Sequence, residues 1–310
     1  MGKLKSSKIG KILNKRLILS SVFFEKDHDI DKAIILAGTG RSGTTWLGEI
    51  LMNLLNYRLM FEPFNPTKVN LFKDMPNKFY IPPNEDNEEY FGKFEQILTG
   101  SVGNRWINQD NRVFKPKGRI IKTIRANLFL KWLRNNFPSV PIVFILRHPC
   151  AVVLSRYRKG WAGKDLEIIM KQDKLIEDFL NPYIDVINGA NTTLQKIACI
   201  WCIENYVPLN SMKNTDWILI NYEDLVLNPE VEINKILKYS KIDLVVDKDS
   251  IKSTSSLTVK KDSAIIEKQD PLKTWKTSLT QSEIKEILGV VEGFSLNKLY
   301  NENVLPNRKV

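Results

Sequence analysis

The sequence predicts an α/β fold of three layers, in which a central, mainly parallel sheet is flanked by helices. Short apolar segments alternate along the chain with longer segments whose apolar residues recur at helical spacing. Several of the short segments are apolar throughout, as expected for strands buried on both faces of a parallel sheet. The chain has 310 residues, 43% hydrophobic and 26% charged, which is an ordinary globular composition and enough length for one large core.

The first half of the chain supplies two strands, each followed by a helix. The run AIILAG (33–38) is short, apolar and ends in glycine, so we predict a strand there, and apolar residues then recur on one helical face over 46–55. Residues 75–92 contain a proline pair and a run of acidic residues, and we expect a loop or insertion. RIIKTI (119–124) reads as a buried strand and LFLKWLRNN (128–136) as the next helix.

The second half repeats this alternation. Pro149 suits the first turn of a helix, and Thr280 with Glu283 three residues later forms a capping-box pattern. The elements predicted here are a strand at 141–147, helices at 149–159 and 193–212, a strand at 217–222, and helices at 229–239 and 281–292.

Charge and cysteine content narrow the class of protein. The net charge of +11 favours anionic partners. Three cysteines cannot all pair and are too few for a disulfide scaffold, so we expect a reducing compartment and a cytoplasmic location. No apolar run approaches the roughly 20 residues of a membrane span.

The basic charge is concentrated at the N-terminus. Residues 1–24 carry six Lys or Arg and no acidic residue, which predicts a solvated basic arm over 1–30. Such an arm suits peripheral contact with an anionic membrane surface. The start MGKLKS also matches the N-myristoylation pattern at Gly2, but this short match is weaker evidence than the charge pattern. The segment lacks the apolar stretch of a secretory signal.

The loop after the first strand is the first candidate site. The run GTGRSGTT, which starts at residue 38, is a glycine-rich turn leading into a helix N-terminus, where backbone N–H groups and the helix dipole favour a phosphate. Its outer glycines keep the spacing of the nucleoside-triphosphatase loop, and Thr45 keeps the hydroxyl. Thr44 replaces the expected lysine, and Arg41 supplies a cation instead.

A second candidate anion site follows the strand at 141–147. That strand ends in Arg147, and Ser155 lies eight residues along the next helix, on nearly the same face as the helix start. A guanidinium and a hydroxyl at these places predict a second phosphate site. A metal-dependent nucleotide enzyme would carry an acidic residue near this strand end, so Arg147 favours metal-free chemistry.

These two motifs resemble the sulfotransferase family. AGTGRSGTTWL is similar to its 5′-phosphosulfate loop and FILRHPCAVVLSRYRKG to its 3′-phosphate segment, while IKTIRANLFLKWL, NYEDLVLNPEVEINKIL and WKTSLTQSEIKEI extend the likeness over about 33–300. The likeness is greater to glycan-modifying and bacterial members than to cytosolic phenol and steroid enzymes. It implies a P-loop-like fold in one domain over 31–310, with 3′-phosphoadenosine-5′-phosphosulfate (PAPS) as donor and 3′-phosphoadenosine-5′-phosphate (PAP) as product. It implies no metal and no nucleic-acid partner.

The resemblance assigns donor-binding residues position by position. Arg41 stands where many members have lysine; it would stabilise charge on the oxygen that bridges to sulfur, but it cannot readily give up a proton. Arg147 and Ser155 would hold the 3′-phosphate and Tyr222 the adenine. An Arg-Lys-Gly run typical of cytosolic members is absent before Trp275, so Lys273 or Lys276 is expected to supply that charge. The implied donor-binding residues are Gly40, Arg41, Ser42, Gly43, Thr44, Thr45, Trp46, Arg147, Ser155, Tyr222, Trp275 and Lys276.

The acceptor hydroxyl needs a general base. His28 is expected at the surface, and His148 adjoins the 3′-phosphate motif, where a local role at a helix start is the better interpretation. Glu62, in LMFEPF, resembles a glutamate of glycan-modifying members and is the candidate base; the alternative is a loop carboxylate that pairs locally. Lys122 and Arg125, in IKTIR, are expected in the same cleft, binding the transferring sulfuryl group or an anionic acceptor, with Lys122 included among the catalytic candidates.

The predicted function is sulfuryl transfer from PAPS to a hydroxyl group, in line, on a carbohydrate or glycan acceptor. Two alternatives stay open: a P-loop kinase acting on a small molecule, and a non-catalytic protein that binds a nucleotide or glycan. The pair Cys199 and Cys202 lies within an apolar helical segment, so we interpret it as buried packing rather than a metal or redox site. The oligomeric state is not encoded in any readable pattern.

Overall fold

Five parallel strands form one sheet in the order β2-β3-β1-β4-β5. The computed structural model describes residues 25, 28–255 and 270–307, so the predicted basic arm and Gly2 lie outside the described residues except for Glu25 and residues 28–30. The parallel sheet, the flanking helices and four of the strands confirm the predicted fold class; β2 was not predicted. The strands are β1 (Ala33–Gly38), β2 (Arg58–Phe61), β3 (Arg119–Thr123), β4 (Ile142–Leu146) and β5 (Ile218–Asn221).

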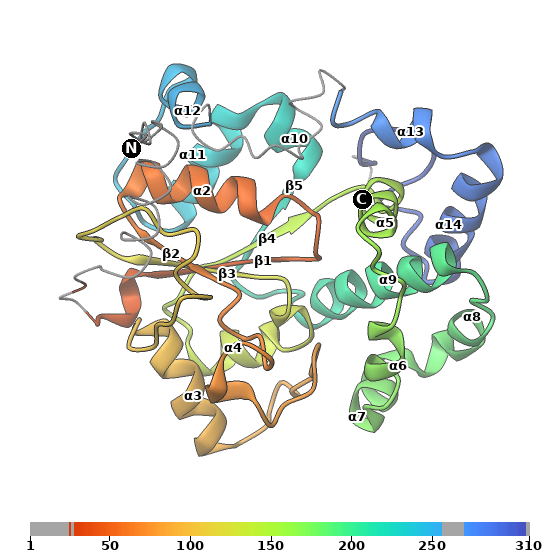
Figure 1. The fold of residues 1–310 in the computed structure, drawn as a ribbon, viewed down its shortest axis with the longest axis horizontal. Helices are drawn as coiled ribbons and strands as arrows, with labels where there is room; N and C mark the ends of the chain where they lie inside the picture. Colours follow the sequence, from red (N-terminus) through yellow and green to blue (C-terminus); the bar gives the residue numbers. More distant parts are fainter. Residues whose placement is uncertain (1–24, 26–27, 256–269, 308–310) are drawn as a thin grey trace, which may run out of the picture.

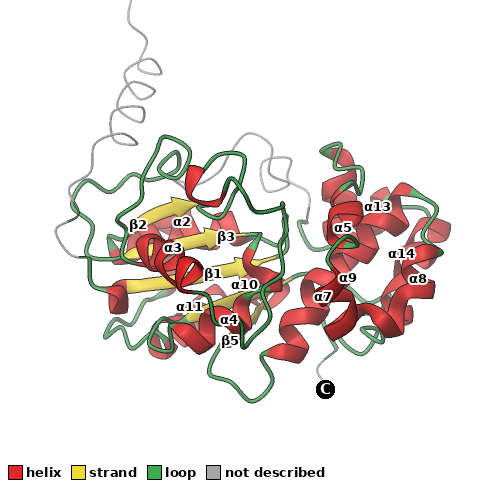
Figure 2. Ribbon diagram, turned by 90° about the horizontal axis from the view of Figure 1, so that it is seen from below, coloured by secondary structure: helices red, strands yellow, loops and turns green. Residues whose placement is uncertain are grey.

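Helices cover both faces of the sheet, and a further group of helices extends beyond the carboxyl ends of its strands (Figure 1, Figure 2). One face packs on α2 and on α10, α11 and α12; the other packs on α3 and α4. The group beyond the strand ends contains α5 to α9, α13 and α14 and has an apolar core of its own. The strand ends therefore face the boundary between the sheet and this helical group.

All six helices that the sequence predicted are present, and they begin and end close to the predicted positions. The capping box at Thr280 is present, with Glu283 and Thr280 exchanging hydrogen bonds. The helices are α2 (Thr44–Leu55), α3 (Glu88–Leu98), α4 (Leu130–Asn136), α5 (Pro149–Arg158), α6 (Asp165–Ile169), α7 (Asp173–Leu175), α8 (Ile184–Asn188), α9 (Thr193–Ser211), α10 (Tyr222–Leu227), α11 (Pro229–Tyr239), α12 (Lys248–Ser255), α13 (Thr274–Ser278) and α14 (Gln281–Gly293), with short 3-10 turns η1 (Ile30–Lys32), η2 (Asn70–Phe72), η3 (Ala126–Leu128) and η5 (Asn181–Tyr183) and the π-helical turn η4 (Ile176–Leu180).

The predicted loop at 75–92 is wrong in its last part. Helix α3 begins at Glu88, where the Asn87 side chain accepts a hydrogen bond from the Tyr90 amide, and the two glutamates of its first turn complement the helix dipole. Glu88 and Glu89, which belong to the acidic run of this segment, therefore form the start of a helix and not a loop. Phe94, Ile97 and Leu98 of α3 are buried against the sheet.

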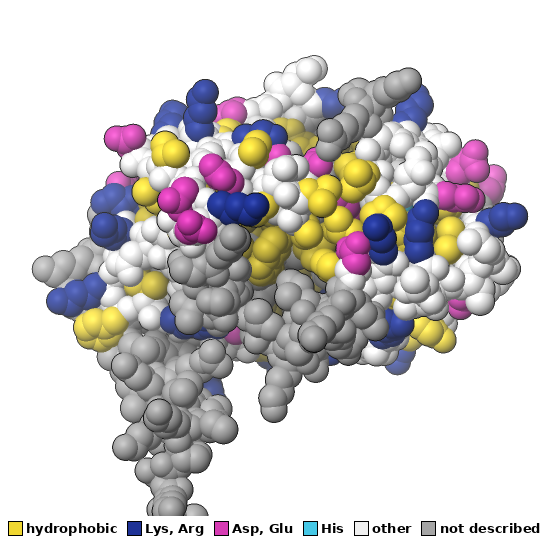
Figure 3. Space-filling view, turned by 90° about the horizontal axis from the view of Figure 1, so that it is seen from above, with side chains coloured by type: hydrophobic (Ala, Val, Ile, Leu, Met, Phe, Trp, Pro, Cys, Tyr) yellow, Lys and Arg dark blue, Asp and Glu magenta, His cyan; other side chains and the backbone are white. Residues whose placement is uncertain are grey.

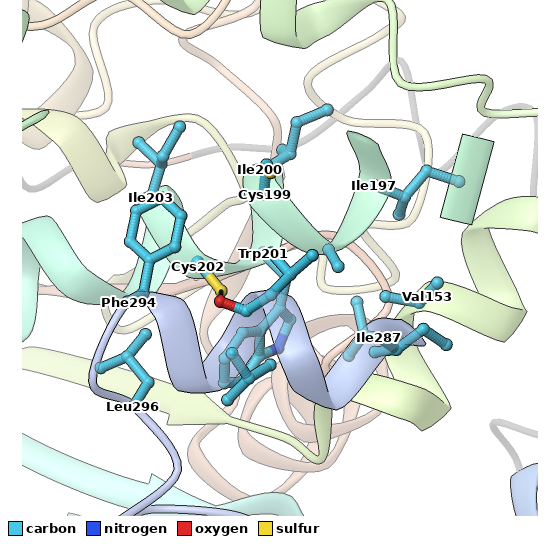
Figure 4. Close-up of a cluster of buried hydrophobic side chains, with 14 of the residues drawn as sticks. Val153, Ile197, Cys199, Ile200, Trp201, Cys202, Ile203, Ile287, Phe294 and Leu296 are labelled. Carbon is cyan, nitrogen blue, oxygen red and sulfur yellow. Dashed lines mark hydrogen bonds between the residues drawn. The ribbon is translucent and has the colours of Figure 1, made fainter. Parts of the chain in front are cut away.

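Helix α9 forms the centre of the helical group (Figure 4). Cys199, Trp201 and Cys202 are fully buried in it, which confirms that the cysteine pair is apolar packing. Burial raises the pKa of the Cys199 thiol to about 12, so both thiols stay protonated at neutral pH. Within the described residues, no helix combines the length and apolarity needed to cross a membrane.

The surface seen in Figure 3 mixes the two signs of charge. Lys and Arg side chains are interspersed there with Asp and Glu, and hydrophobic side chains gather near the middle of the face. The coloured part of this face therefore carries no continuous basic patch.

Candidate functional site

The loop between β1 and α2 lies at the carboxyl end of the central strand. Arg41 and Gly43 both have left-handed backbone conformations, with φ of 76° and 103°, so the loop curls tightly before α2 begins at Thr44. The N-cap residue is Gly43, which has no side chain to cap the helix. As at any helix start, the first amide N–H groups of α2 have no intrahelical partners, and they point toward the loop, as in an anion site.

Two glycines of the loop allow other side chains to approach its backbone. A Cβ atom on Gly43 would lie 2.5 Å from Cδ2 of Tyr222, and one on Gly40 would lie 2.7 Å from Cζ3 of Trp161. Tyr222 begins α10 at the end of β5, and Trp161 follows α5. Glycine at 40 and 43 thus brings two aromatic rings from distant segments against the loop.

Arg41, Ser155 and Arg147 converge beside this loop. The Arg41 Nε atom donates to the Ser155 hydroxyl at 2.9 Å, and the Arg147 Nη1 atom donates to the Arg41 carbonyl at 3.0 Å. Arg147 also donates to the carbonyl of Pro271 at 3.2 Å. Segments more than 100 residues apart in sequence therefore bring two guanidinium groups and a hydroxyl together, which is the donor set that a phosphate requires.

Tyr222 and Trp46 complete this side of the site. The Arg147 guanidinium carbon lies 4.0 Å from the centroid of the Tyr222 ring, a cation–π arrangement, and Trp46 meets the same ring edge-on at 6.1 Å. Tyr222 is 6% exposed, so most of its ring is committed to these contacts.

Trp275 is buried against His148, the residue that follows Arg147. Its indole is 1% exposed and stacks on His148 with ring centroids 4.2 Å apart, and Lys276 lies over the outer face of the indole at 5.5 Å. The Nδ1 atom of His148 accepts a hydrogen bond from the Cys150 amide, which confirms its expected role at a helix start. Burial lowers the pKa of His148 to about 4, so its ring is neutral at pH 7.

A second cluster lies at the carboxyl ends of β2 and β3. Glu62 accepts hydrogen bonds from Lys122 Nζ at 2.5 Å, from Arg125 Nη1 at 2.7 Å and from the Ile124 amide at 3.2 Å. The sequence predicted that Glu62, Lys122 and Arg125 share a cleft, and the structure brings them into direct contact. Glu62 is 1% exposed and has a φ of 48°, in the left-handed region.

The electrostatics of Glu62 favour its ionised form. Burial by itself would raise the pKa of the carboxyl, but Lys122 and Arg125 together hold that pKa below its usual value. An ionised carboxylate is the form that a base needs. A lowered pKa also means that the carboxylate accepts a proton less readily while both cations are in contact with it.

A third charged cluster was not predicted from the sequence. Glu204, fully buried in α9, accepts hydrogen bonds from Thr39 of the loop and from Arg156 at 2.6 Å, and forms an ion pair with Lys78 at 2.5 Å. Arg156 also donates to the Gly40 carbonyl at 3.1 Å. Although burial raises the pKa of Glu204, Arg156 and Lys78 outweigh it and lower the pKa to about 2. The sequence offered one signal for this cluster: Glu204 is a carboxylate that directly follows the apolar run CIWCI (199–203), and a buried carboxylate needs charged partners.

A pocket of about 370 Å³ opens beside the loop at Gly40. Its lining combines the exposed ring of Trp161 with isoleucines from the β3–η3 connection and from α9, and with the charged side chains of Arg125, Arg156 and Lys78. The pocket thus contacts both of the clusters that contain buried glutamates. Among the described residues, no group of three or more His, Cys, Asp or Glu side chains could hold a metal ion.

Comparison with known proteins identifies a family. Residues 31–287 match the model of the sulfotransferase domain. No curated protein matches the sequence significantly.

Solved structures similar to this chain have low sequence identity to it. They include a sulfotransferase domain from the curacin biosynthetic pathway, with 15% identity, a TM-score of 0.45, and coverage of 85% of this chain and 97% of that one. Mouse sulfotransferase SULT7A1 complexed with PAP gives 15% identity, a TM-score of 0.43, and coverage of 94% and 90%. A sulfotransferase from Alicyclobacillus acidocaldarius gives 12% identity, a TM-score of 0.39, and coverage of 84% and 95%.

Proposed function

The chain belongs to the sulfotransferase family, and from that premise we propose that it transfers the sulfuryl group of PAPS to a hydroxyl group of a carbohydrate or glycan acceptor. The observation that carries the proposal is the hydrogen-bonded convergence of Arg41, Arg147 and Ser155 at the end of the central strands. One group of donors at a glycine-rich loop and a second on the neighbouring strand and helix match a donor that has two phosphate positions. The acceptor class rests on the sequence resemblance alone.

The loop has features that fit a phosphosulfate group. Its backbone is shaped by glycines that bring Tyr222 and Trp161 close, and the Ser42 hydroxyl is buried with no hydrogen-bond partner among the described residues. PAPS would supply the sulfuryl group, and the chain would contribute the amide groups of Gly43, Thr44 and Thr45 and the loop hydroxyls as hydrogen-bond donors. Gly40 of the loop and Trp46 in the first turn of α2 would shape the sides of this site.

Arg147 and Ser155 are proposed to hold the 3′-phosphate. Both now bond to Arg41, so an anion entering between them would replace those contacts with charge-assisted hydrogen bonds. Tyr222 would contact the adenine with the small part of its ring that is exposed. Trp275 would act through its stacking on His148, and Lys276, which is exposed, would add positive charge at the edge of the site.

Glu62 is proposed as the general base and Lys122 as a catalytic cation. The carboxylate is ionised and would take the proton of the acceptor hydroxyl, while Lys122 and Arg125 lie close enough to turn toward an incoming anion. Movement of either cation away from Glu62 would raise the proton affinity of the carboxylate as the anion is bound. Proton transfer would then be coupled to occupation of the site.

The donor assignment is tested by calorimetric titration of the purified chain with PAP and, separately, with ATP, both in a chelator. We expect micromolar or tighter binding of PAP and weak binding of ATP. A preference for ATP that strengthens with magnesium would support the small-molecule kinase and overturn the proposal. Binding of neither ligand by folded protein would overturn both enzyme assignments.

Turnover separates an enzyme from a binding protein. With PAPS and a panel of neutral and acidic saccharides, we expect release of PAP that depends on the saccharide and persists in chelator. Tight PAP binding without any PAP release would favour a non-catalytic nucleotide-binding protein. Release with phenols and steroids but with no saccharide would overturn the proposed acceptor class.

A further inference from the structure

We propose that the pocket beside Gly40 binds an acceptor that carries an anionic group, a carboxylate or a sulfate ester, next to a ring that lies on Trp161. This inference rests on the proposed function and adds a chemical class to the acceptor. The pocket has a volume of about 370 Å³, enough for one or two sugar rings, and borders the phosphosulfate loop through the contact of Trp161 with Gly40. A group bound there would lie beside the donor site.

The charge around the pocket is unbalanced. Its lining contains four cations and one carboxylate, Asp165. Behind the lining, Glu204 pairs with two of the cations, and Glu62 pairs with a third and with Lys122. Five cations against three carboxylates leave a net charge of +2. The cations are Lys78, Lys122, Arg125, Arg156 and Lys164.

Two of the guanidinium groups each keep one nitrogen that makes no hydrogen bond to the described residues. Arg125 uses Nε on Asn77 and Nη1 on Glu62, and within the described part of the chain its Nη2 atom makes no hydrogen bond. Arg156 uses Nε and Nη2 on Gly40, Thr39 and Glu204, and its Nη1 atom likewise has no partner there. Both side chains line the pocket, so these donors are available to a bound anion.

Lys164 adds a third available cation at the mouth. It is exposed, lines the pocket, and has no ion-pair partner among the residues that the structure describes. Asp165 beside it accepts a hydrogen bond from Asn77, which also accepts from Arg125. The neighbouring carboxylate is therefore part of the scaffold that orients Arg125.

The apolar part of the lining suits the face of a ring. Trp161 is 42% exposed although it is a large aromatic residue, and Ile124, Ile197 and Ile200 form the rest of this wall. The Arg156 guanidinium lies over one face of the Trp161 ring, 5.7 Å from its centroid. A ring stacked on the exposed face would place a substituent near Arg125 and Lys164.

The test uses a matched pair of probes that differ in one group. The full chain, saturated with PAP, is titrated calorimetrically with 4-nitrophenyl β-D-glucuronide and with 4-nitrophenyl β-D-glucoside, and then with the 6-sulfated glucoside. We expect the carboxylate or the sulfate probe to bind at least tenfold more tightly than the neutral one, with an affinity that falls as salt is added. The anionic probe that binds more tightly identifies whether the anionic group of the acceptor is a carboxylate or a sulfate ester.

Variants assign the effect to the pocket. Lys164→Gln is expected to weaken the preferred anionic probe about threefold to tenfold, Arg125→Gln to abolish the preference, and Trp161→Ala to weaken all three probes. Lys171→Gln, an exposed lysine outside the pocket, is the control and is expected to change nothing. PAP affinity is measured for each variant and is expected to stay within about twofold for Lys164→Gln.

The outcomes separate this inference from the proposed function. If PAP binds and the three glycosides bind equally, or none binds, the anionic acceptor is overturned and the donor assignment stands. If the glucuronide preference is present but is equally lost in Lys171→Gln, the charge acts at long range and the pocket assignment is overturned. If PAP does not bind, the proposed function is overturned, and the inference that rests on it is overturned as well.

Discussion

Single residues at the strand ends bring two guanidinium groups to the loop after β1. Arg41 takes a positive φ and so presents its carbonyl to Arg147 and its side chain to Ser155 at the same time. Positive φ costs an ordinary residue free energy, and such strain persists at sites where the surroundings hold it in place. The arrangement joins the loop to the end of β4 through the Arg41 carbonyl and to α5 through the Arg41 side chain.

Arg147→Ala is expected to weaken PAP binding by about 1.5–3 kcal/mol, the range for a hydrogen bond to a charged group, or roughly 10- to 150-fold. The loss should appear in calorimetric titration with PAP. Arg158→Ala removes an exposed arginine at the end of α5, the helix that follows Arg147, and is the matched control. Equal PAP affinity of Arg147→Ala and the unmodified chain would exclude Arg147 from the site.

Gly43→Ala is expected to reduce PAP affinity by more than tenfold. The added Cβ would lie 2.5 Å from the Tyr222 ring, and alanine is strained at a φ of 103°, so the loop or the ring must shift. Gly92→Ala, where an added Cβ meets nothing within 4 Å, is the control and should leave PAP binding unchanged. An unaffected Gly43→Ala would show that the loop backbone does not contact the donor.

Glu62→Gln is expected to lower kcat by about 10²–10⁴-fold, the range for loss of a general base, with PAP affinity nearly unchanged. Because Lys122 and Arg125 outweigh burial and lower the pKa of Glu62, the free enzyme keeps this carboxylate ionised to lower pH than an ordinary glutamate. The loss of kcat/KM that this group causes, which reports the free enzyme, should therefore occur at lower pH than the titration of an ordinary glutamate. A pH–rate profile checks this, and retained turnover in Glu62→Gln would assign the base elsewhere.

At the scale of elements, the start of α5 depends on a buried neutral histidine. His148 lies between the stacked Trp275 ring and the edge of Tyr300, accepts a hydrogen bond from the Cys150 amide, and bonds to the Asn301 carbonyl through its other ring nitrogen. Its own amide donates to Glu223 at 2.9 Å. The strand end that positions Arg147 is thus fixed by the C-terminal segment as well as by α5.

The free energy of unfolding is expected to fall by up to about 3 kcal/mol as the pH decreases from 6.5 to 4, from the His148 contribution. The folded pKa is lowered to about 4, so within this range the unfolded chain binds a proton that the folded chain does not, and stability rises with pH. Chemical denaturation at several pH values measures the slope. His148→Asn keeps a capping acceptor and does not titrate, so its curve should lack this slope; identical slopes would contradict the prediction.

At the scale of the whole molecule, a buried charge cluster joins the sheet to the helical group. Glu204 comes from α9, while its partners come from the loop after β1, from α5 and from the segment before α3. These segments meet only in the folded chain. The cluster therefore fixes the position of the helical group relative to the loop, and with it the floor of the pocket.

Glu204→Gln is expected to lower the free energy of unfolding by about 3–5 kcal/mol at pH 7, because Lys78 and Arg156 would stay buried without their carboxylate. The folded pKa of Glu204 is about 2, so its contribution is present above the usual glutamate pKa and is lost as the pH falls toward 2. Denaturation at pH 7 and at pH 3 should show a smaller difference at pH 3. Glu167→Gln, on the exposed side of α6, is the control; a Glu204→Gln chain of unchanged stability would contradict the expectation.

Features that depend on neighbouring residues could be predicted from the sequence, whereas features that depend on contacts between distant segments could not. Strands 33–38 and 141–147 and the helix after Thr280 were predictable because apolar runs and capping residues act within a few positions. The four-residue strand β2 carries Arg58 in a fully buried ion pair with Glu25, and a charged residue inside so short a strand hides its pattern. The helix α3 was missed because an acidic first turn looks like a loop.

The sequence by itself determined the order of elements, the glycine-rich loop and the residue types at the ends of the strands, since each depends on neighbouring positions. Only the tertiary structure decided that Arg41 bonds to Ser155, that Glu62 is buried between two cations, and that Glu204 links α9 to the loop. The physical reason is that the charge state and partners of a side chain depend on which segments pack around it. Burial disfavours the charged form, and an opposite charge brought close by packing favours it. Sequence neighbours carry no record of that packing.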